Sequence, residues 1–250
     1  MSNDVQISVR TLVEYVFQGG SIDSRFRSQS TLLDGTRIHQ KIQKTYQETD
    51  QKEVYLRAEL PFQDLTFVID GRCDGLLFRD GEVIVDEIKS FSQPLDSSLK
   101  DGVPVHWAQA KMYAFMYSKD HELAEMSVQL TYVHVESEAK KYVKKNFTFS
   151  ELESFATEMI EGYAPYATLQ QNHRSNRNES IKALQFPFET YRAGQRKLAG
   201  AVYKTTLDKK SLFAKAPTGI GKTISTLFPA VKAMGEGPLN RVFYLTAKTI

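Results

Sequence analysis

The stretch GRCDGLLFRDGEVIVDEIKS, residues 71–90, decides the predicted fold. Its two halves are rich in apolar residues and flank Asp80-Gly81, a dipeptide that tolerates the positive φ angles of a tight hairpin turn. Charged residues are depleted in strands and costly to bury alone. Four of them nevertheless lie in the two predicted strands: Asp74, Asp86, Glu87 and Lys89. We therefore expect these side chains to face either water or a charged partner in a cleft.

The spacing of the charged residues suggests a metal site. Because side chains alternate along a strand, Glu87 and Lys89 should point to one face of the sheet and Asp86 to the other. If Asp74 lies opposite Glu87 on the neighbouring strand, two carboxylates and an ammonium group meet. Such carboxylates suit a hard divalent cation, which can bind a phosphate oxygen and acidify a water molecule. The alternative is an exposed Glu87–Lys89 ion pair without a function.

Hydrophobic periodicity predicts the other elements of the N-terminal part. The predicted helices are residues 7–17, 36–47, 105–118 and 149–170. The predicted strands are residues 54–60, 66–70, 73–79 and 82–89, and a second hairpin formed by 126–136 and 140–149. This order of helices and strands predicts a mixed α/β or α+β core.

A polar stretch separates two predicted domains. QQNHRSNRNES, residues 170–180, has almost no apolar residues, so we expect a linker at 173–182 between a domain at 1–172 and a second at 183–250. The second domain is predicted to contain a helix near 193–205. The segments SLFAKA and RVFYLT, on either side of a glycine turn and another helix, are predicted as strands. Together they form the start of a βαβ unit.

Composition narrows the class of protein. A hydrophobic content of 41% in 250 residues allows one large domain or two ordinary ones. The net charge of +2 gives no strong electrostatic footprint for nucleic acid, although a local patch can suffice. One cysteine, Cys73, excludes an intrachain disulfide and a metal site made of cysteines alone. Without a membrane-spanning apolar run or a secretory signal, we expect a cytoplasmic protein with no membrane partner.

Three residues outside the hairpin extend its pattern. His39 lies on a predicted helix, and Gln109 and Tyr113 lie four apart on another, hence on one helical face. The sequence resembles the RecB-like branch of the PD-(D/E)XK nuclease superfamily over about residues 30–118. The residues that carry this resemblance are, in order, His39, Asp74, Glu87-Ile88-Lys89, Gln109 and Tyr113.

The resemblance implies a fold and an activity. The fold is a mixed-sheet, restriction-endonuclease-like α/β core flanked by helices. The resemblance further implies that His39, Asp74 and Glu87 bind Mg²⁺ or Mn²⁺ and that Lys89 assists hydrolysis of a DNA phosphodiester. The glutamine and tyrosine of the later helix would position the lysine or the substrate strand. The expected partner is DNA, single-stranded or with single-stranded ends.

A second motif lies in the C-terminal part. APTGIGKT, residues 216–223, follows a predicted apolar strand and precedes a predicted helix, which is the context that a phosphate-binding loop requires. The glycines let the backbone approach a phosphate, and the N-terminus of the following helix favours its charge. The lysine would reach the β- and γ-phosphates, and the final threonine would hold Mg²⁺.

Ala216, where the general loop pattern has glycine, narrows the resemblance. With it, the motif resembles the Walker A motif of XPD/DinG-like superfamily 2 helicases. FPFETYRAGQ at 186–195 resembles the Q-motif region of that branch, and VFYLTAKT at 242–249 its motif Ia. The resemblance implies the beginning of a P-loop, RecA-like motor that binds ATP. The residues implied to bind it are Arg192, Gln195, Thr218, Gly219, Gly221, Lys222 and Thr223.

The motor motifs are incomplete up to Ile250, because no Walker B acid follows the loop. We therefore expect residues 1–250 to be the front of a longer nuclease–helicase, with the remainder of the helicase as a partner, and to hydrolyse no ATP alone. Two alternatives stay open. The nuclease fold could bind DNA without turnover, or the chain could be an ATP-binding regulatory domain beside a scaffold.

Overall fold

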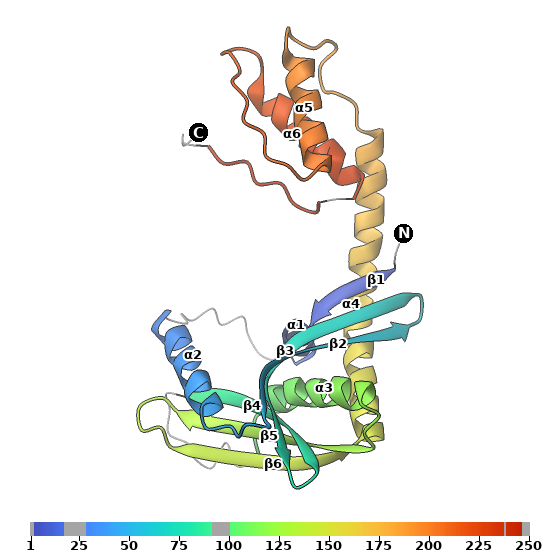
Figure 1. Ribbon diagram of the computed structural model, residues 1–250. Helices are drawn as coiled ribbons and strands as arrows, with labels where there is room; N and C mark the ends of the chain where they lie inside the picture. The colour runs from blue at the N-terminus through green and yellow to red at the C-terminus, as the bar shows by residue number, and fades with distance from the viewer. Residues whose placement is uncertain (1–2, 18–28, 92–100, 238, 247–250) are drawn as a thin grey trace. The chain divides into compact units, whose positions relative to one another are not determined.

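The computed structural model describes residues 3–17, 29–91, 101–237 and 239–246, with the backbone alone over 29–34. The chain divides into two compact units (Figure 1), an N-terminal unit at Met1–Pro165 and a C-terminal unit at Tyr166–Ile250. Each unit is described by itself below. None of the helices in the described residues has the length and apolar character needed to cross a membrane.

Within the described residues of the N-terminal unit, six strands form one mixed sheet (Figure 1). The strands are β1 (Asp4–Ser8), β2 (Gln51–Phe62), β3 (Leu65–Arg79), β4 (Glu82–Phe91), β5 (Glu125–His134) and β6 (Lys140–Thr148). Their order is β1-β3-β4-β5-β6, and β2 pairs with β3 as well. The β1–β3 and β4–β5 pairs are parallel and the remaining pairs are antiparallel.

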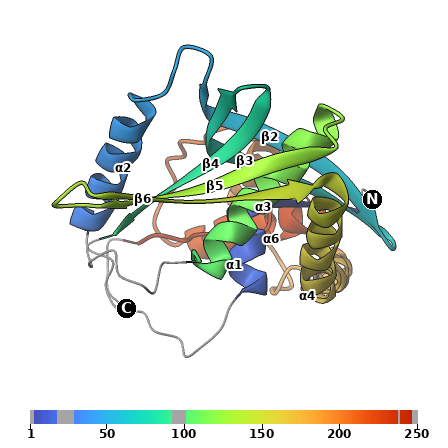
Figure 2. The same cartoon turned by 90° about the horizontal axis from the view of Figure 1, so that it is seen from below.

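Helices cover both faces of this sheet. They are α1 (Val9–Val16), α2 (Gln29–Gln43), α3 (Pro104–Asp120) and the first part of α4 (Phe149–Ala183). Helices α1 and α3 lie together on one side of the sheet (Figure 2). Ile88 of β4 packs against Ile38 and Ile42 of α2, whereas Lys89 contacts Gln109 of α3. Because neighbouring side chains of a strand point to opposite faces, α2 and α3 cover opposite faces of β4. The mixed sheet flanked by helices agrees with the predicted restriction-endonuclease-like core.

The predicted hairpin is the β3–β4 hairpin. Asp80 has a φ of 49° and Gly81 a φ of 85°, the positive values that the sequence predicted for this turn. The register pairs Arg79 with Glu82 and continues to Gly75 and Asp86. The separate strands predicted at 66–70 and 73–79 are wrong, because β3 is continuous. Antiparallel pairing with β2 extends from Leu65 to Leu76 and carries the strand through Gly71 and Arg72.

Strand β3 has two different neighbours along one edge. Thr66–Asp70 pair with both β1 and β2, and Gly75 and Leu76 pair with both β2 and β4. Because β2 occupies one edge of β3 from Leu65 to Leu76, β1 and β4 share the other edge. Residues 71–74 therefore lie between the end of β1 and the end of the β4 pairing, at a fork in the sheet. Asp74 is the last residue of this fork.

The N-terminal elements differ from the prediction in their limits. The predicted helix at 7–17 begins as strand β1, and α1 starts only at Val9, where the Ser8 side chain accepts the Thr11 N–H at 3.1 Å and caps the helix. The predicted helix at 36–47 is the second half of α2, which ends at Gln43. Strand β1 depends on distant pairing with β3, which local periodicity does not report.

The predicted linker is wrong as an irregular segment, because residues 173–182 lie inside α4. Beyond Pro165 this stretch contains no glycine or proline, and glutamine, arginine, glutamate and lysine are good helix formers. In the C-terminal unit Ile181 of this helix packs on Gly235, where a Cβ would lie 2.6 Å from the isoleucine. The ammonium group of Lys232 donates to three carbonyls, two in the last turn of α4 and that of Leu184 just after it, at 2.9 to 3.2 Å. The domain limits 1–172 and 183–250 stay predictions.

The C-terminal unit contains two helices, α5 (Gln195–Leu207) and α6 (Lys222–Gly235), at the places predicted for helices. The predicted strands at 211–216 and 241–246 are wrong. Neither segment pairs with a strand in the described part of the chain, and Phe213 is 97% and Leu245 91% exposed. A strand is stabilised by backbone hydrogen bonds to a neighbouring strand, and no strand of the described residues pairs with these segments. The parallel sheet of a P-loop motor is not formed by the described residues, and 247–249 of the predicted motif Ia lie outside them.

Candidate metal and nuclease site

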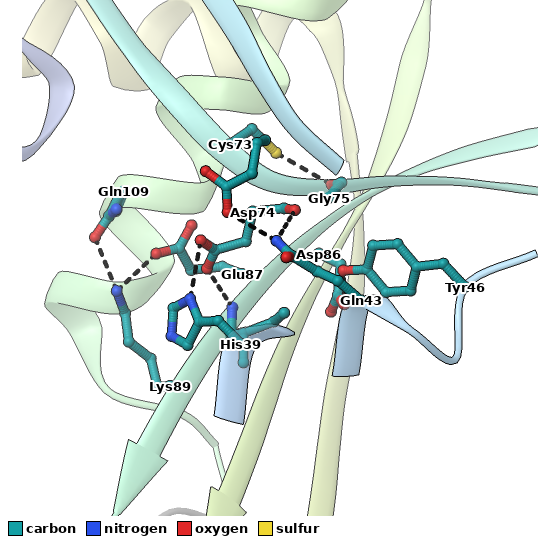
Figure 3. A network of polar contacts seen from close by, with 12 residues as sticks. His39, Gln43, Tyr46, Cys73, Asp74, Gly75, Asp86, Glu87, Lys89 and Gln109 are labelled. Atoms are coloured by element: carbon teal, nitrogen blue, oxygen red, sulfur yellow. Dashed lines mark hydrogen bonds and ion pairs between the residues drawn. The ribbon is translucent and has the colours of Figure 1, made fainter. Parts of the chain in front are cut away.

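Asp74 sits at the fork of the sheet and is held from three directions (Figure 3). Its Oδ2 accepts the backbone N–H of Ile88 at 2.8 Å, where a regular ladder would place the next β3–β4 hydrogen bond. Its Oδ1 lies 3.3 Å from Nδ1 of His39 on α2. Its backbone carbonyl accepts the side-chain amide of Gln43 at 2.9 Å. The fork thus fixes one carboxylate at the junction of β3, β4 and α2.

Glu87 and Lys89 lie beside Asp74 (Figure 3). The Glu87 carboxylate is 1% exposed, and its Oε1 accepts the ammonium group of Lys89 at 2.6 Å. Its Oε2 is buried and has no hydrogen-bond partner among the described residues. Burial, followed by the charge of Asp74, raises the pKa of Glu87 to about 8, although Lys89 and His39 act in the opposite direction. A second positive charge near Oε2 would favour the ionised carboxylate.

The two helix residues of the predicted set hold the lysine. The side-chain oxygen of Gln109 accepts a hydrogen bond from Lys89 Nζ at 3.2 Å, and the Gln109 side chain acts in turn on the Tyr113 hydroxyl, whose pKa it lowers against the effect of burial. Burial raises the pKa of Tyr113, so this hydroxyl remains protonated at neutral pH. Tyr113 packs over Gly71, where a Cβ would lie 2.8 Å from its hydroxyl oxygen. Glycine at the fork therefore makes room for the tyrosine.

The structure brings His39, Asp74, Glu87, Lys89, Gln109 and Tyr113 into one connected cluster. Within the described residues, however, no three His, Cys, Asp or Glu side chains are arranged to hold a metal ion. The side chains pair with one another instead: His39 contacts Asp74, and Lys89 occupies one oxygen of Glu87. The unpartnered Glu87 Oε2 beside a second carboxylate nevertheless provides the oxygen donors that a hard divalent cation prefers.

Asp86 belongs to a separate buried network on the α2 face of the sheet. Its carboxylate accepts the Tyr46 hydroxyl at 2.7 Å and the Gln129 amide at 3.0 Å, and it also accepts the Thr131 hydroxyl. Tyr46 packs over Gly75, the residue paired with Asp86. With three donors, Asp86 is satisfied within the protein. The alternation of the strand keeps it apart from the Glu87 cluster.

The sequence did not identify Gln43 as a partner of Asp74 or Tyr46 as a partner of Asp86. Both follow His39 at helical spacing, four and seven positions later, although the last lies just beyond the end of α2. The signal that could have found them is this shared face of the predicted helix 36–47.

The glycine-rich loop of the C-terminal unit precedes α6 as predicted. Gly219 and Gly221 have φ angles of 86° and 82°, in the left-handed region that favours glycine. Lys222 begins α6, but its ammonium group donates to the Pro217 carbonyl at 2.9 Å. The guanidinium of Arg192 donates to the Gly219 carbonyl at 2.6 Å. The loop and the Q-motif segment are therefore in contact.

These two segments line a cavity of about 570 Å³. All seven residues predicted to bind ATP lie at the cavity or in the glycine-rich loop. Arg192, Gln195, Gly221 and Thr223 line the cavity, and Gly219 lies next to it in sequence. Thr218 is exposed in the same loop. The Gln195 amide approaches so closely that a Cβ at Gly221 would lie 2.5 Å from it.

Comparison with known proteins supports the N-terminal assignment. The pattern of the PD-(D/E)XK nuclease superfamily matches residues 6–202, which is more than half of the chain. Nucleases of this superfamily use divalent metals such as Mg²⁺. A comparison with curated proteins returned no match. Among matching solved structures, one described as "Crystal structure of SSO0001" has 19% sequence identity and a TM-score of 0.42, and the match covers 62% of this chain and 75% of that chain.

Proposed function

Because the chain belongs to the PD-(D/E)XK nuclease superfamily, we propose that it hydrolyses DNA phosphodiester bonds at the Asp74–Glu87 cluster with a divalent metal. The observation that carries this proposal is the buried Glu87 carboxylate, whose Oε2 has no partner among the described residues although a second carboxylate lies beside it. Burying an unsatisfied carboxylate is costly for stability alone, so a cation is the ligand that this arrangement favours. His39 is proposed as a third ligand.

A divalent cation held there would supply Lewis acidity for a phosphate oxygen and lower the pKa of a water molecule. The residues of the chain supply position. Asp74 is fixed by the Ile88 N–H and by His39, and Glu87 is fixed by burial. Lys89 is held by Gln109 and Glu87, so its charge stays at the site, where it can stabilise negative charge that develops on a phosphate.

The test is cleavage of end-labelled oligonucleotides, single-stranded and duplex, with Mg²⁺ or Mn²⁺. We expect Asp74→Asn, Glu87→Gln and Lys89→Ala each to lower the rate by at least about 100-fold with the fold retained. Glu82→Gln, which removes a carboxylate from the exposed pair with Lys144, is the matched control and should leave the rate unchanged. Cleavage that persists in all three site variants would contradict the assigned site.

Single-stranded DNA, or DNA with single-stranded ends, is the proposed substrate because the RecB-like resemblance implies it. A blunt duplex of the same sequence is the control, and equal cleavage rates on both would contradict this preference. If the wild-type protein binds oligonucleotides but cleaves neither with either metal, the chain is instead a DNA-binding module built on the nuclease fold.

The C-terminal unit supports a second proposal, namely a nucleoside triphosphate site of the XPD/DinG helicase type. It rests on the left-handed glycines before α6, on the contact of Arg192 with Gly219 and on the cavity between the loop and the Q-motif segment. Titration with a fluorescent ATP analogue and Mg²⁺ should saturate, and Lys222→Ala should weaken binding at least about tenfold. Unchanged affinity in the variant would refute the site. We expect no steady-state ATP hydrolysis by residues 1–250.

A further inference from the structure

Gln43 joins Asp74 to strand β2. Its side-chain amide donates to the Asp74 carbonyl at 2.9 Å and to the Glu53 carboxylate at 2.8 Å. Gln43 is 9% exposed, so its amide is largely shielded from water. One amide nitrogen thus connects the last residue of α2 with two neighbouring strands.

The sheet is irregular at this point. Along β2 and β3 the paired residues run consecutively from Gln51–Leu76 to Phe62–Leu65, except that Glu53 and Asp74 are left out of the ladder. Glu53 also has a φ of 53°, a left-handed conformation that a non-glycine residue rarely adopts inside a strand. Such strain persists only where surrounding contacts enforce it, and it is concentrated near functional sites. The Gln43 amide supplies a contact to each member of the omitted pair.

Helix α2 therefore holds Asp74 twice. His39 contacts the Asp74 carboxylate, and Gln43, one turn later on the same helical face, binds the Asp74 carbonyl. Next to the fork, Gly75 and Leu76 of β3 pair with β2 on one edge and with β4 on the other. Asp74 itself pairs with neither strand. The position of its backbone thus depends on the Gln43 amide and on the Ile88 N–H that its carboxylate accepts.

We propose that Gln43 is a positioning residue, which fixes the Asp74 backbone so that its carboxylate meets the cation beside Glu87. This inference rests on the proposed nuclease function. Residues that orient metal ligands, without touching the metal, typically change metal affinity or activity by about 10- to 100-fold when they are replaced. Gln43 has no other assigned role in the reaction.

Two variants separate positioning from packing. Gln43→Met keeps the volume of the side chain and removes the donor without adding a charge. The double variant Gln43→Glu with Glu53→Gln reverses the donor and acceptor of the side-chain pair and preserves the net charge. In the double variant, position 53 can donate to position 43, but the Asp74 carbonyl has no amide donor. Glu53→Gln alone, which leaves the bond to Asp74, and Gln40→Glu on an exposed position of α2 are the controls.

The whole chain is titrated with Mn²⁺ alone, followed by electron paramagnetic resonance of the free ion, and the urea midpoint and oligonucleotide cleavage are measured in parallel. We expect the double variant, which keeps the side-chain pair, to lower the urea midpoint less than Gln43→Met does but to bind Mn²⁺ about 10- to 100-fold more weakly than the wild type. We also expect kcat to fall while KM for the oligonucleotide stays within about twofold, because Gln43 makes no contact with substrate in this account. Gln43→Met should lose the same Mn²⁺ affinity, and both controls should behave as the wild type.

Mn²⁺ affinity and kcat that return to wild-type values in the double variant would overturn the inference, because the side-chain pair alone would then account for the role of Gln43. A loss of Mn²⁺ affinity in the variants that is no larger than the loss of folding stability shown by their urea midpoints would overturn the inference as well. If the wild-type protein itself neither binds Mn²⁺ nor cleaves DNA, the proposed function fails and this inference fails with it. If the wild type is active and the double variant equally active, only this inference fails.

Discussion

Replacing Glu87 with glutamine should stabilise the metal-free protein at neutral pH even as it removes a metal ligand. The carboxylate of Glu87 is buried, one of its oxygens has no partner among the described residues, and Asp74 lies beside it. The neutral amide introduced by Glu87→Gln lacks the charge that burial disfavours, and its carbonyl oxygen can still accept the Lys89 ammonium group. Because Glu87→Gln conserves the shape of the side chain and removes only its charge, it isolates the electrostatic cost of burying the Glu87 carboxylate.

The size and sign of the effect follow from the pKa of Glu87, which is raised from the ordinary 4.5 to about 8. Between these two values the folded carboxyl keeps a proton that the unfolded chain has released, so the free energy of unfolding falls as the pH rises. Each pH unit in this window contributes about 1.4 kcal/mol, so the wild type should lose roughly 2 to 3 kcal/mol between about pH 5.5 and 7.5 on account of this group. His39, whose pKa is raised because Asp74 outweighs the effect of burial, adds a loss of the same sign in both proteins.

The assay is urea unfolding at about pH 5.5 and about pH 7.5 with EDTA present, on the wild type and on Glu87→Gln. The variant should show a clearly smaller loss of stability between the two pH values, whereas Glu82→Gln, at an exposed carboxylate, should follow the wild type. Added Mn²⁺ should raise the stability of the wild type at the higher pH, because an ion that binds the folded state stabilises it. The stability of Glu87→Gln should stay unchanged, because this variant lacks a ligand for the ion. Equal pH dependence in Glu87→Gln and wild type would refute the reasoning.

Two further predictions concern residues around the site. Asp50→Asn should lower the free energy of unfolding at pH 7 by about 2 kcal/mol, because the Arg79 guanidinium holds the pKa of this carboxyl down to about 2. Urea unfolding measures this stabilisation, which should be present above about pH 4 and disappear as the pH falls toward about 2. Gly71→Ala should destabilise the protein by about 1 to 3 kcal/mol and slow oligonucleotide cleavage, since the new methyl group would lie 2.8 Å from the Tyr113 hydroxyl. The control is Gly200→Ala in α5, where the methyl group would enter open space, and it should be neutral or stabilising in thermal unfolding. An unchanged stability in Asp50→Asn, or a Gly71→Ala protein as stable and active as the wild type, would contradict the respective argument.

The elements that local sequence determines were predicted well. The β3–β4 hairpin follows from Asp80-Gly81 and from the apolar residues on either side, and α3 lies within two residues of the helix predicted at 105–118. The order of the motif residues also led to the correct superfamily. Each of these features depends on neighbours in the sequence or on a fixed order of residue types, which a single sequence displays directly.

The features that long-range pairing determines were not predicted. The fork at residues 71–74 exists because β1 and β4 share one edge of β3, and neither strand carries a local signal for that partner. The contact of Gln43 with Asp74 depends on the same arrangement. Conversely, the apolar segments at 211–216 and 241–246 have the composition of strands but no partner strand in the described residues, so composition alone led to a wrong prediction.

The polar stretch at 170–180 shows a further limit of composition. Its residues were interpreted as a linker because few are apolar, yet they continue α4. Polar side chains with good helix propensity extend a helix when no glycine or proline interrupts it. Buried Asn178 and Ile181 then anchor this part of the helix in the C-terminal unit.

Titration of the whole chain with Mn²⁺, measured by electron paramagnetic resonance, tests the metal site most directly. The wild type should bind the ion with saturation, and both Asp74→Asn and Glu87→Gln should weaken this binding by at least about 100-fold, because each removes a charged oxygen ligand. Binding of the same affinity and stoichiometry in the wild type and in both variants would show that these two carboxylates hold no metal ion.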